Sequence, residues 1–456
     1  MRFILALWAS KFLLFILKLK KAHQDDKPGL LAYRICKNFN EKINKPKLVI
    51  AVTGTNGKTT VSSLIASILE KDHKKVGYND WGANTLAGHA RCLIDCVTIF
   101  NRPKKDVAVL EVDEMTSRET LKATDPDYII VTNIAKDSIR RNESPDYIFS
   151  ILKESLNSLS KAKIFLNADD PISSFLVSGD RVKYFGVAKT KDKIVDYKSK
   201  DFVICPKCYS KVEYIYQQYR AIGRFYCPRC DFKSKNSDYQ LSLSLAKDEA
   251  ILKYANKEEK YPLISSGIFE LYNEVAVLAL FKELNYSYED LHNLISQVGI
   301  TKIRKEETVV KNIKVLRHAT KGQNSSAAAV VFEVVGEDPK TKEVILILDE
   351  EYEHFNGTET ITWIYDADFE FLNKPNIRKI IVGGKRCLDY RLRLLLAGIP
   401  EDKIITVSTE DNLADYITID KELEEVDILY EIGKVQKSCK LQEQLIKKIE
   451  GEAYED

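Results

Sequence analysis

A glycine-rich turn followed by lysine and threonine lies near the start of the chain, where residues 53–60 read TGTNGKTT. It follows the apolar run Leu48–Val52, which predicts a buried parallel strand, and it precedes a helical pattern of apolar residues. Strand, glycine turn and helix in this order hold nucleoside triphosphates, because backbone N–H groups face the phosphates and the lysine reaches the outer ones. A threonine hydroxyl at the helix start can ligate Mg²⁺.

The turn therefore predicts a nucleotide site, in a shortened form of the phosphate-binding loop. The full spacing of that motif needs a glycine at position 52, where this chain has Val52. An ordinary glycine turn between a strand and a helix is the alternative. The residues predicted to bind ATP and Mg²⁺ here, with Lys58 also catalytic, are Thr55, Asn56, Gly57, Lys58, Thr59 and Thr60.

An acidic segment ends the next predicted strand, Asp106–Val112, and supplies Glu111 and Glu114. A carboxylate at the carboxyl end of a strand beside a phosphate loop can bind Mg²⁺, directly or through water. A solvated strand end is the alternative. We predict that Glu111 or Glu114 takes part in cation binding.

Two more predicted strands, Asp127–Ile134 and Ile164–Pro171, also end in polar turns, and the first of these turns contains Asn133. Parallel strands bring their carboxyl ends to one edge of a sheet, where open α/β sheets bind ligands. Further strands and helices alternate after position 304, with no glycine-rich phosphate loop among them. The sequence predicts an α/β fold, with a second Rossmann-like domain at the C-terminal end.

Two C-x-x-C pairs, Cys205/Cys208 and Cys227/Cys230, flank an aromatic stretch that has a β-strand composition. Four thiolates in this spacing bind Zn²⁺ tetrahedrally, and a ribbon with so little core needs the metal to fold. A catalytic zinc would require an open ligand position. A nucleic-acid-binding ribbon is an alternative, but the stretch has no basic stripe, so we predict a structural zinc ribbon inserted at about 200–235.

The composition gives a broad class. A chain of 456 residues forms two or three domains, and a formal net charge of +2 provides no overall field that favours nucleic acid. Nine cysteines without a signal-peptide cleavage pattern favour a reducing compartment, and we expect a cytoplasmic protein. Five histidines without metal spacing are expected at the surface or in turns: His23, His73, His89, His292 and His354.

The N-terminal segment Phe3–Leu17 is almost continuously apolar and is followed by lysines. It is shorter than the roughly 20 apolar residues that a membrane-spanning helix needs. Three interpretations stay open: a helix packed on the first domain, a basic amphipathic helix on a membrane surface, and a true span. Pro28-Gly29 is expected to end the segment.

The shortened loop resembles that of the Mur ligases, the ATP-dependent enzymes that build the peptidoglycan stem peptide. A zinc ribbon inserted in the central domain, together with residues 362–370 (TWIYDADFE), narrows the resemblance to the MurT family. The resemblance implies domain limits of 1–43 for an N-terminal helix and linker, 44–300 for the central ATP-binding domain, and 301–456 for the C-terminal domain. It favours Glu111 over Glu114 as the Mg²⁺ carboxylate.

The same resemblance implies three further nucleotide-binding residues, Asn133, Asn273 and Arg304. Asn273 stands near the start of a helix predicted at Ile268–Leu280, and Arg304 at the junction of the domains. Ile303 replaces a glycine of the family motif beside Arg304. It is one of four departures from the family motifs, which together suggest a divergent member.

Members of the MurT family are the ligase subunits of lipid II isoglutaminyl synthases. The resemblance implies amidation of the D-glutamate α-carboxylate of lipid II through an acyl phosphate, with ammonia from a GatD-type glutaminase in a heterodimer. It also implies that the protein acts at the inner face of the membrane and has no nucleic-acid partner. An aspartate that the family contributes to the glutaminase site aligns here with Glu359 or with Thr360, and we take Glu359 as the candidate.

Two other functions stay open. A Mur-type ligase could add an amino acid rather than ammonia, although the zinc ribbon speaks against it. A non-catalytic nucleotide-binding scaffold is suggested by the departures from the family motifs. Turnover of ATP with lipid II, ammonium and Mg²⁺ separates these possibilities.

Overall fold

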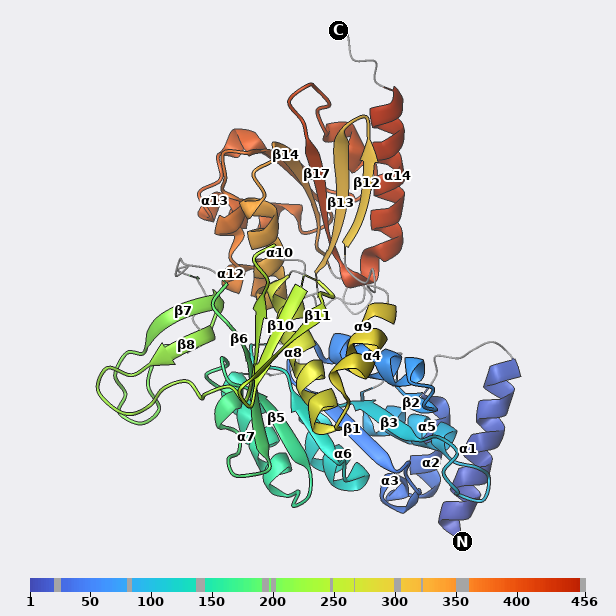
Figure 1. The fold of residues 1–456 in the computed structure, drawn as a ribbon. Helices are drawn as coiled ribbons and strands as arrows, with labels where there is room; N and C mark the ends of the chain where they lie inside the picture. Colours follow the sequence, from blue (N-terminus) through green and yellow to red (C-terminus); the bar gives the residue numbers. More distant parts are fainter. Residues whose placement is uncertain are drawn as a thin grey trace. The chain divides into compact units, whose positions relative to one another are not determined.

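The computed structural model describes residues 1–19, 26–79, 84–136, 144–190, 197, 202–246, 249–265, 267–298, 305–320, 323–349 and 361–451. The chain divides into two compact units, drawn in Figure 1. The first comprises Met1–Ala135, Ser144–Val195 and Asp201–Ile300. The second comprises Lys136–Glu143, Asp196–Lys200 and Thr301–Asp456.

Nine strands of the described chain form the sheet of the first unit, in the order β11-β10-β9-β6-β5-β4-β1-β3-β2. Neighbouring strands are parallel from β2 to β9, whereas β9, β10 and β11 are antiparallel. The strands are β1 (Leu48–Thr53), β2 (Val76–Tyr78), β3 (Val107–Glu111), β4 (Tyr128–Val131), β5 (Lys163–Asn167), β6 (Val182–Val187), β9 (Tyr239–Leu243), β10 (Glu249–Tyr254) and β11 (Lys257–Pro262).

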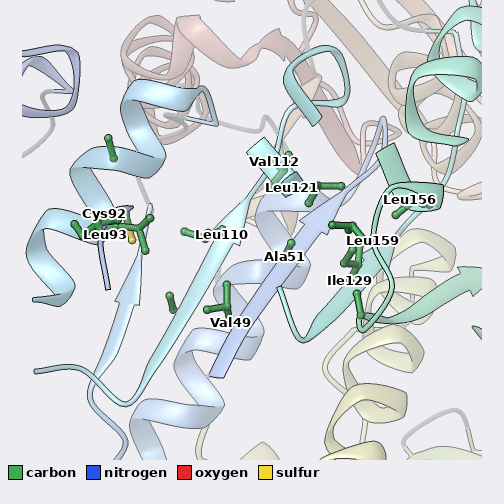
Figure 2. Close-up of a cluster of buried hydrophobic side chains, with 14 of the residues drawn as sticks. Val49, Ala51, Cys92, Leu93, Leu110, Val112, Leu121, Ile129, Leu156 and Leu159 are labelled. Carbon is green, nitrogen blue, oxygen red and sulfur yellow. The ribbon is translucent and has the colours of Figure 1, made fainter. Parts of the chain in front are cut away.

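Helices cover both faces of this sheet, as buried parallel strands require. The helices of this unit are α1 (Arg2–Leu19), α2 (Lys27–Ile35), α3 (Phe39–Lys42), α4 (Lys58–Lys71), α5 (Leu86–Cys96), α6 (Ser117–Thr124), α7 (Pro145–Asn157), α8 (Ile268–Glu283) and α9 (Tyr288–Gln297). Figure 2 shows the core on one face, where Val49 and Leu110 of the strands meet Leu93 of α5 and Leu121 of α6. This core holds β1, β3 and β4 in register, and their ends form the candidate site.

The N-terminal segment packs onto this unit as helix α1. Ala6, Leu7 and Leu14 of α1 belong to the same buried cluster as the sheet residues. The packed-helix interpretation is thus confirmed for one face of α1. Within the described ranges, no helix has both the length and the apolar character that crossing a bilayer requires.

Pro28-Gly29 does not merely end the segment, as the sequence suggested. Pro28 lies in the first turn of α2, where its missing N–H costs nothing. A Cβ at Gly29 would lie 1.8 Å from the carbonyl oxygen of Ala87, so only glycine lets α2 pack this closely against α5.

No pattern in the sequence predicted β2, β6 or the antiparallel extension β9–β11. Ala255 and Asn256 join β10 to β11, and both have positive φ (43° and 62°). A two-residue turn of this kind matches the twist of a hairpin, although Ala255 gave no sign of it in the sequence.

The inserted ribbon is a separate small sheet of β7 (Glu213–Tyr219) and β8 (Ile222–Tyr226), which projects from the rest of the first unit (Figure 1). Its core is small and contains Val212, Phe225 and Phe232 beside two of the cysteines.

The second unit contains a six-stranded sheet in the order β12-β13-β17-β14-β15-β16, in which only the β12–β13 pair is antiparallel among the described strands. The strands are β12 (Lys305–Val310), β13 (Ile313–Thr320), β14 (Lys342–Ile347), β15 (Ile377–Gly383), β16 (Ile404–Val407) and β17 (Glu425–Glu431), and the helices are α10 (Ser325–Glu337), α12 (Trp363–Asp366), α13 (Cys387–Leu396) and α14 (Val435–Gly451). Parallel-rich sheets in both units confirm the predicted α/β class.

Candidate nucleotide site and cysteine cluster

The predicted phosphate loop joins β1 to α4 in the first unit. Two glycines with positive φ, Gly54 (116°) and Gly57 (88°), turn the chain, and Gly57 precedes Lys58 at the start of α4. The first turn of α4 carries Thr59, whose side chain is exposed, and Thr60. The exposed hydroxyl and the amides of a helix N-terminus are the groups that a phosphate and its cation require.

Lys58 is buried and forms an ion pair with Glu114. Its Nζ donates to Glu114 Oε1 at 2.9 Å and to the carbonyl oxygen of Gly54 at 2.6 Å. An ammonium has three N–H donors, so one remains for a phosphate oxygen. Burial disfavours the ammonium, but the charge of Glu114 and its hydrogen bond outweigh burial and raise the pKa of Lys58. The lysine is held charged at the loop.

Glu111 ends β3 beside the loop, because β1 and β3 pair in register at Val52 and Glu111. Its Oε1 accepts from Asn84 Nδ2 at 3.4 Å, whereas its buried Oε2 has no hydrogen-bond partner among the described residues. A buried carboxylate oxygen without a partner is costly unless a cation or water reaches it. The oxygen donors that Glu111 and Thr59 offer are of the type that a hard divalent cation such as Mg²⁺ prefers.

Asn133, at the end of β4, binds the loop backbone itself. Its Oδ1 accepts from the N–H of Asn56 at 3.2 Å, and its Nδ2 donates to the carbonyl oxygen of Asn56 at 3.0 Å. Thr55 adds a bond in which its Oγ1 accepts from the N–H of Ala135 at 3.1 Å. Asn133 was predicted as a ligand-binding residue, and in this structure it fixes the shape of the loop.

Asn273, on α8, lies against the same loop. An ideal Cβ at Gly57 would be only 2.4 Å from Asn273 Oδ1, so the side chain occupies the space that any residue other than glycine would need. The neighbouring Tyr272 donates its hydroxyl to Asp169 Oδ2 at 2.8 Å, in the turn after β5. The Tyr272–Asp169 bond, which fixes the start of α8, was not predicted; the polar turn after the strand was its only sign.

His89 corrects the sequence expectation, because it is fully buried on α5 instead of lying at the surface or in a turn. Its Nε2 lies 2.7 Å from the carbonyl oxygen of Glu111, so Nε2 carries the proton and donates it. Burial lowers the pKa of His89 to about 4, although this hydrogen bond acts in the opposite direction. Asn79 Nδ2 donates to the same carbonyl at 3.0 Å. Together they position the backbone of Glu111.

The structure thus brings the predicted loop, Glu111, Glu114, Asn133 and Asn273 to one edge of one sheet. Arg304, Glu359 and Thr360 lie outside the described residues.

The four cysteines of the ribbon gather at one point. The sulfur atoms of Cys205, Cys208, Cys227 and Cys230 all lie within 4.8 Å of one another. Sulfur ligands about 2.3 Å from a tetrahedral Zn²⁺ stand about 3.8 Å apart, which this cluster matches. Short antiparallel bridges, Ile204 with Lys211 and Tyr226 with Lys233, close each C-x-x-C turn. The donor set and its spacing fit a structural zinc ion.

Comparison with known proteins gives the family. The model of the Mur ligase middle domain matches residues 52–226, and that of the MurT ligase C-terminal domain matches residues 322–431. The lipid II isoglutaminyl synthase (glutamine-hydrolyzing) subunit MurT of Staphylococcus aureus is 30% identical over 381 residues, which cover 82% of this chain and 83% of the relative. The chain belongs to the MurT family. The MurT subunit of Streptococcus pneumoniae is 26% identical over 84% of both chains.

Solved structures show the same fold. A pseudomurein peptide ligase type C from Methanothermus fervidus superposes with a TM-score of 0.65 at 20% identity, over 89% of this chain and 79% of the neighbour. A MurF ligase of Thermotoga maritima in complex with ADP gives 0.57 at 16% identity, over 94% and 84%. The predicted Mur-ligase fold is confirmed.

Proposed function

We propose that this chain is the ligase subunit of a lipid II isoglutaminyl synthase and amidates the D-glutamate α-carboxylate of lipid II to D-isoglutamine. The observation that carries the proposal is the phosphate loop of a MurT-family chain, with Lys58 held charged beside it. Such a protein acts in peptidoglycan synthesis, in the cytoplasm at the inner face of the membrane.

The reaction needs ATP but no nucleophile from the protein. A carboxylate oxygen of the substrate attacks the γ-phosphorus, ADP leaves, and an acyl phosphate forms. Ammonia then attacks the acyl carbon, inorganic phosphate leaves, and a proton is released. Catalysis of this kind depends on positioning and on neutralising phosphate charge.

The residues of the loop supply that positioning and charge. The remaining N–H of Lys58 meets an outer phosphate oxygen, while Glu114 keeps the ammonium aimed at the loop. Asn133 and Asn273 hold Asn56 and Gly57 so that the loop does not have to reorganise when nucleotide arrives. In the MurT resemblance, Arg304 joins the nucleotide site.

Two metals complete the proposal. Mg²⁺ would be held by Glu111 and Thr59, and it would neutralise charge on the phosphates. Zn²⁺ would be held by Cys205, Cys208, Cys227 and Cys230, with all four positions filled by protein, so that its role is structural.

We also propose a GatD-type glutaminase as the partner in a heterodimer. The named MurT relatives are subunits of a glutamine-hydrolysing synthase, which supports a separate source of ammonia for this chain. Glu359 is the residue that we propose to face the glutaminase site.

Incubation of the purified chain with ATP, Mg²⁺, lipid II and saturating ammonium tests the proposal. We expect ADP release together with a carboxylate-to-carboxamide mass change on lipid II. ATP binding without any amidated product would support the scaffold alternative. A product that carries an added amino acid, when amino acids are supplied, would support the Mur-type ligase instead.

A further inference from the structure

Helix α1 buries only one of its faces in the first unit. Opposite that face, large apolar side chains at positions spaced three and four residues apart form one exposed stripe. Trp8, Phe12 and Phe15 of this stripe expose 53%, 67% and 59% of their surface. We call the stripe and its neighbouring loop residues the apolar face, and its members are Ile4, Leu5, Trp8, Phe12, Phe15, Leu19, Ile99 and Phe100.

The loop residues of the apolar face are held in place. Trp8 Nε1 donates to the carbonyl oxygen of Ile99 at 2.9 Å, which ties the loop to α1. Val97 bridges to Pro103, and Asn44 makes two bonds to Asn101 (3.0 and 2.7 Å) at the turn. Phe100 is 71% exposed on this anchored loop. These bonds fix the backbone of the loop in the conformation that exposes Ile99 and Phe100.

Basic residues lie on the same two segments as the apolar face. In the described part of α1, Arg2 and Lys18 are exposed and no residue is acidic, and residues 99–105 contain Arg102, Lys104 and Lys105 and no acidic residue. Asp95, the acidic residue of α5 beside α1, is paired with Lys18 at 3.0 Å and with Lys104 at 3.9 Å. The whole chain has a net charge of only +2, so this concentration is local.

We infer that the apolar face of α1 and of the 98–103 loop docks on an anionic phospholipid surface. Aromatic and leucine side chains flanked by lysine and arginine are the composition of helices that lie in a membrane interface. Anionic head groups attract the flanking charges. A second copy of this chain fits less well, since its identical face would bring the same positive charges with no acidic partners.

Helix α1 would lie parallel to the membrane surface, because its other face packs against the protein core. Figure 1 shows α1 at the edge of the first unit, beside α2 and α5. Lys11 Nζ donates to the carbonyl oxygens of Ile94 (2.7 Å) and Val97 (2.6 Å) and fixes the helix there. The inference rests on the proposed function in one respect only, that a lipid-linked substrate would lie at the same surface.

Sedimentation of the full-length protein with vesicles tests the inference. The vesicles are phosphatidylcholine alone, or an equimolar mixture with phosphatidylglycerol, and contain neither lipid II nor ATP. We expect binding to the anionic vesicles that weakens with added salt. In the triple variant Phe12→Ser, Phe15→Ser and Phe100→Ser, we expect the bound fraction to fall roughly tenfold.

A matched control removes equally exposed apolar side chains elsewhere. The triple variant Leu388→Ser, Leu392→Ser and Leu396→Ser on α13 should bind as the unmodified protein does. Arg102→Glu should weaken binding to anionic vesicles without changing the apolar face. All the substituted side chains are exposed, and equal unfolding midpoints confirm that the variants fold.

Three results would overturn the inference: no binding of the unmodified protein to anionic vesicles, equal binding of the two triple variants, or a dimer that only the first triple variant dissociates. Ammonium-driven amidation of detergent-solubilised lipid II does not need a bilayer. Its failure would therefore count against the proposed function and leave the vesicle result standing.

Discussion

Lys58 and Glu114 are both almost fully buried, with 9% and 4% of their side chains exposed. Such a pair is costly to form but more costly to break, because the remaining partner becomes an uncompensated buried charge. At the scale of single residues, the Lys58–Glu114 pair is therefore needed for the stability of the fold as well as for the chemistry of the nucleotide loop. The two requirements can be separated by substitution.

Lys58→Ala is expected to lower ATP turnover by about a hundredfold or more, since one charge on the phosphates is lost. It should also lower the free energy of unfolding by about 3 kcal/mol, since Glu114 loses its partner. Lys58→Met combined with Glu114→Gln should recover most of the stability but none of the turnover. Denaturant unfolding and a coupled ADP assay measure the two effects. A stable and active Lys58→Ala protein would remove the assignment of the loop.

His89 gives the fold a dependence on pH. Its pKa is about 4 in the folded chain, against 6.5 as the ordinary value, so the unfolded chain binds the proton first. The contribution of His89 to stability is full above pH 6.5 and falls by about 3 kcal/mol as the pH is lowered toward 4. His89→Gln keeps a donor for the carbonyl of Glu111 and should flatten this part of the curve. Unfolding measured at several pH values checks it.

The exposed His73, changed to Gln, is the control for that series and should leave the curve unchanged. An unaltered pH dependence in His89→Gln would mean that other groups cause the acid sensitivity.

At the scale of elements, α8 and the phosphate loop fit each other at one glycine. Gly57 has a φ of 88°, and a side chain there would meet Asn273. Gly179 has a φ of 112° but no atom within 4 Å of a built Cβ, so it isolates the cost of backbone strain. Comparing substitutions at Gly57 and Gly179 therefore separates the effect of backbone strain from the effect of contact with Asn273.

Gly57→Ala and Gly179→Ala should each cost about 1–2 kcal/mol of stability, because both require a left-handed conformation. Only Gly57→Ala should also weaken ATP binding, since the loop and Asn273 must move apart. Calorimetric titration with ATP and Mg²⁺ measures the affinity. Equal losses of affinity in both variants would show that Asn273 does not shape the site.

The ribbon is a second element with a contact to α8. Tyr219 of β7 packs against Phe269 (centroids 4.4 Å apart) and Tyr272 (5.9 Å), and the N–H of Gly223 donates to the carbonyl oxygen of Asp169 at 2.8 Å. Loss of the metal from the ribbon should therefore disturb the packing at the start of α8.

Cys205→Ser is expected to release zinc and destabilise the first unit, because the ribbon's small core cannot fold without the metal. Metal analysis and thermal unfolding measure both effects. Cys439→Ser, whose sulfur accepts a hydrogen bond from Arg317, is the control and should keep its zinc. A metal-free Cys205→Ser protein of unchanged stability would contradict the structural role of the cluster.

At the scale of the whole molecule, the proposal joins a ligase to a separate supply of ammonia. Glu359→Ala should lower glutamine-driven amidation in the presence of the glutaminase and leave ammonium-driven amidation unchanged. Product analysis with each nitrogen source checks this split. Equal loss with both sources would place Glu359 in the ligase site. Glu422→Ala, at an exposed position of the second unit, is the matched control.

The sequence by itself located the candidate nucleotide and cysteine sites and most of the parallel strands. TGTNGKTT, the acidic strand end and the four cysteines predicted their sites because each depends on residue types at short, fixed spacings. The strands β1, β3, β4 and β5 were predicted because a buried parallel strand leaves an uninterrupted apolar run. The hairpins β10–β11 and β12–β13 were missed, since their turns carry Ala255, Asn256, Lys311 and Asn312 instead of glycine.

Only the tertiary structure decided which distant residues support the site. His89 and Tyr272 are separated by many residues from the carbonyl of Glu111 and from Asp169, and no local pattern links these pairs. The apolar run of α1 likewise left its orientation open. The structure divides that run into a buried face with Leu7 and Leu14 and an exposed face with Phe12 and Phe15. Packing against α2 and α5 makes this division, and a hydrophobic pattern that continues around the helix cannot specify it.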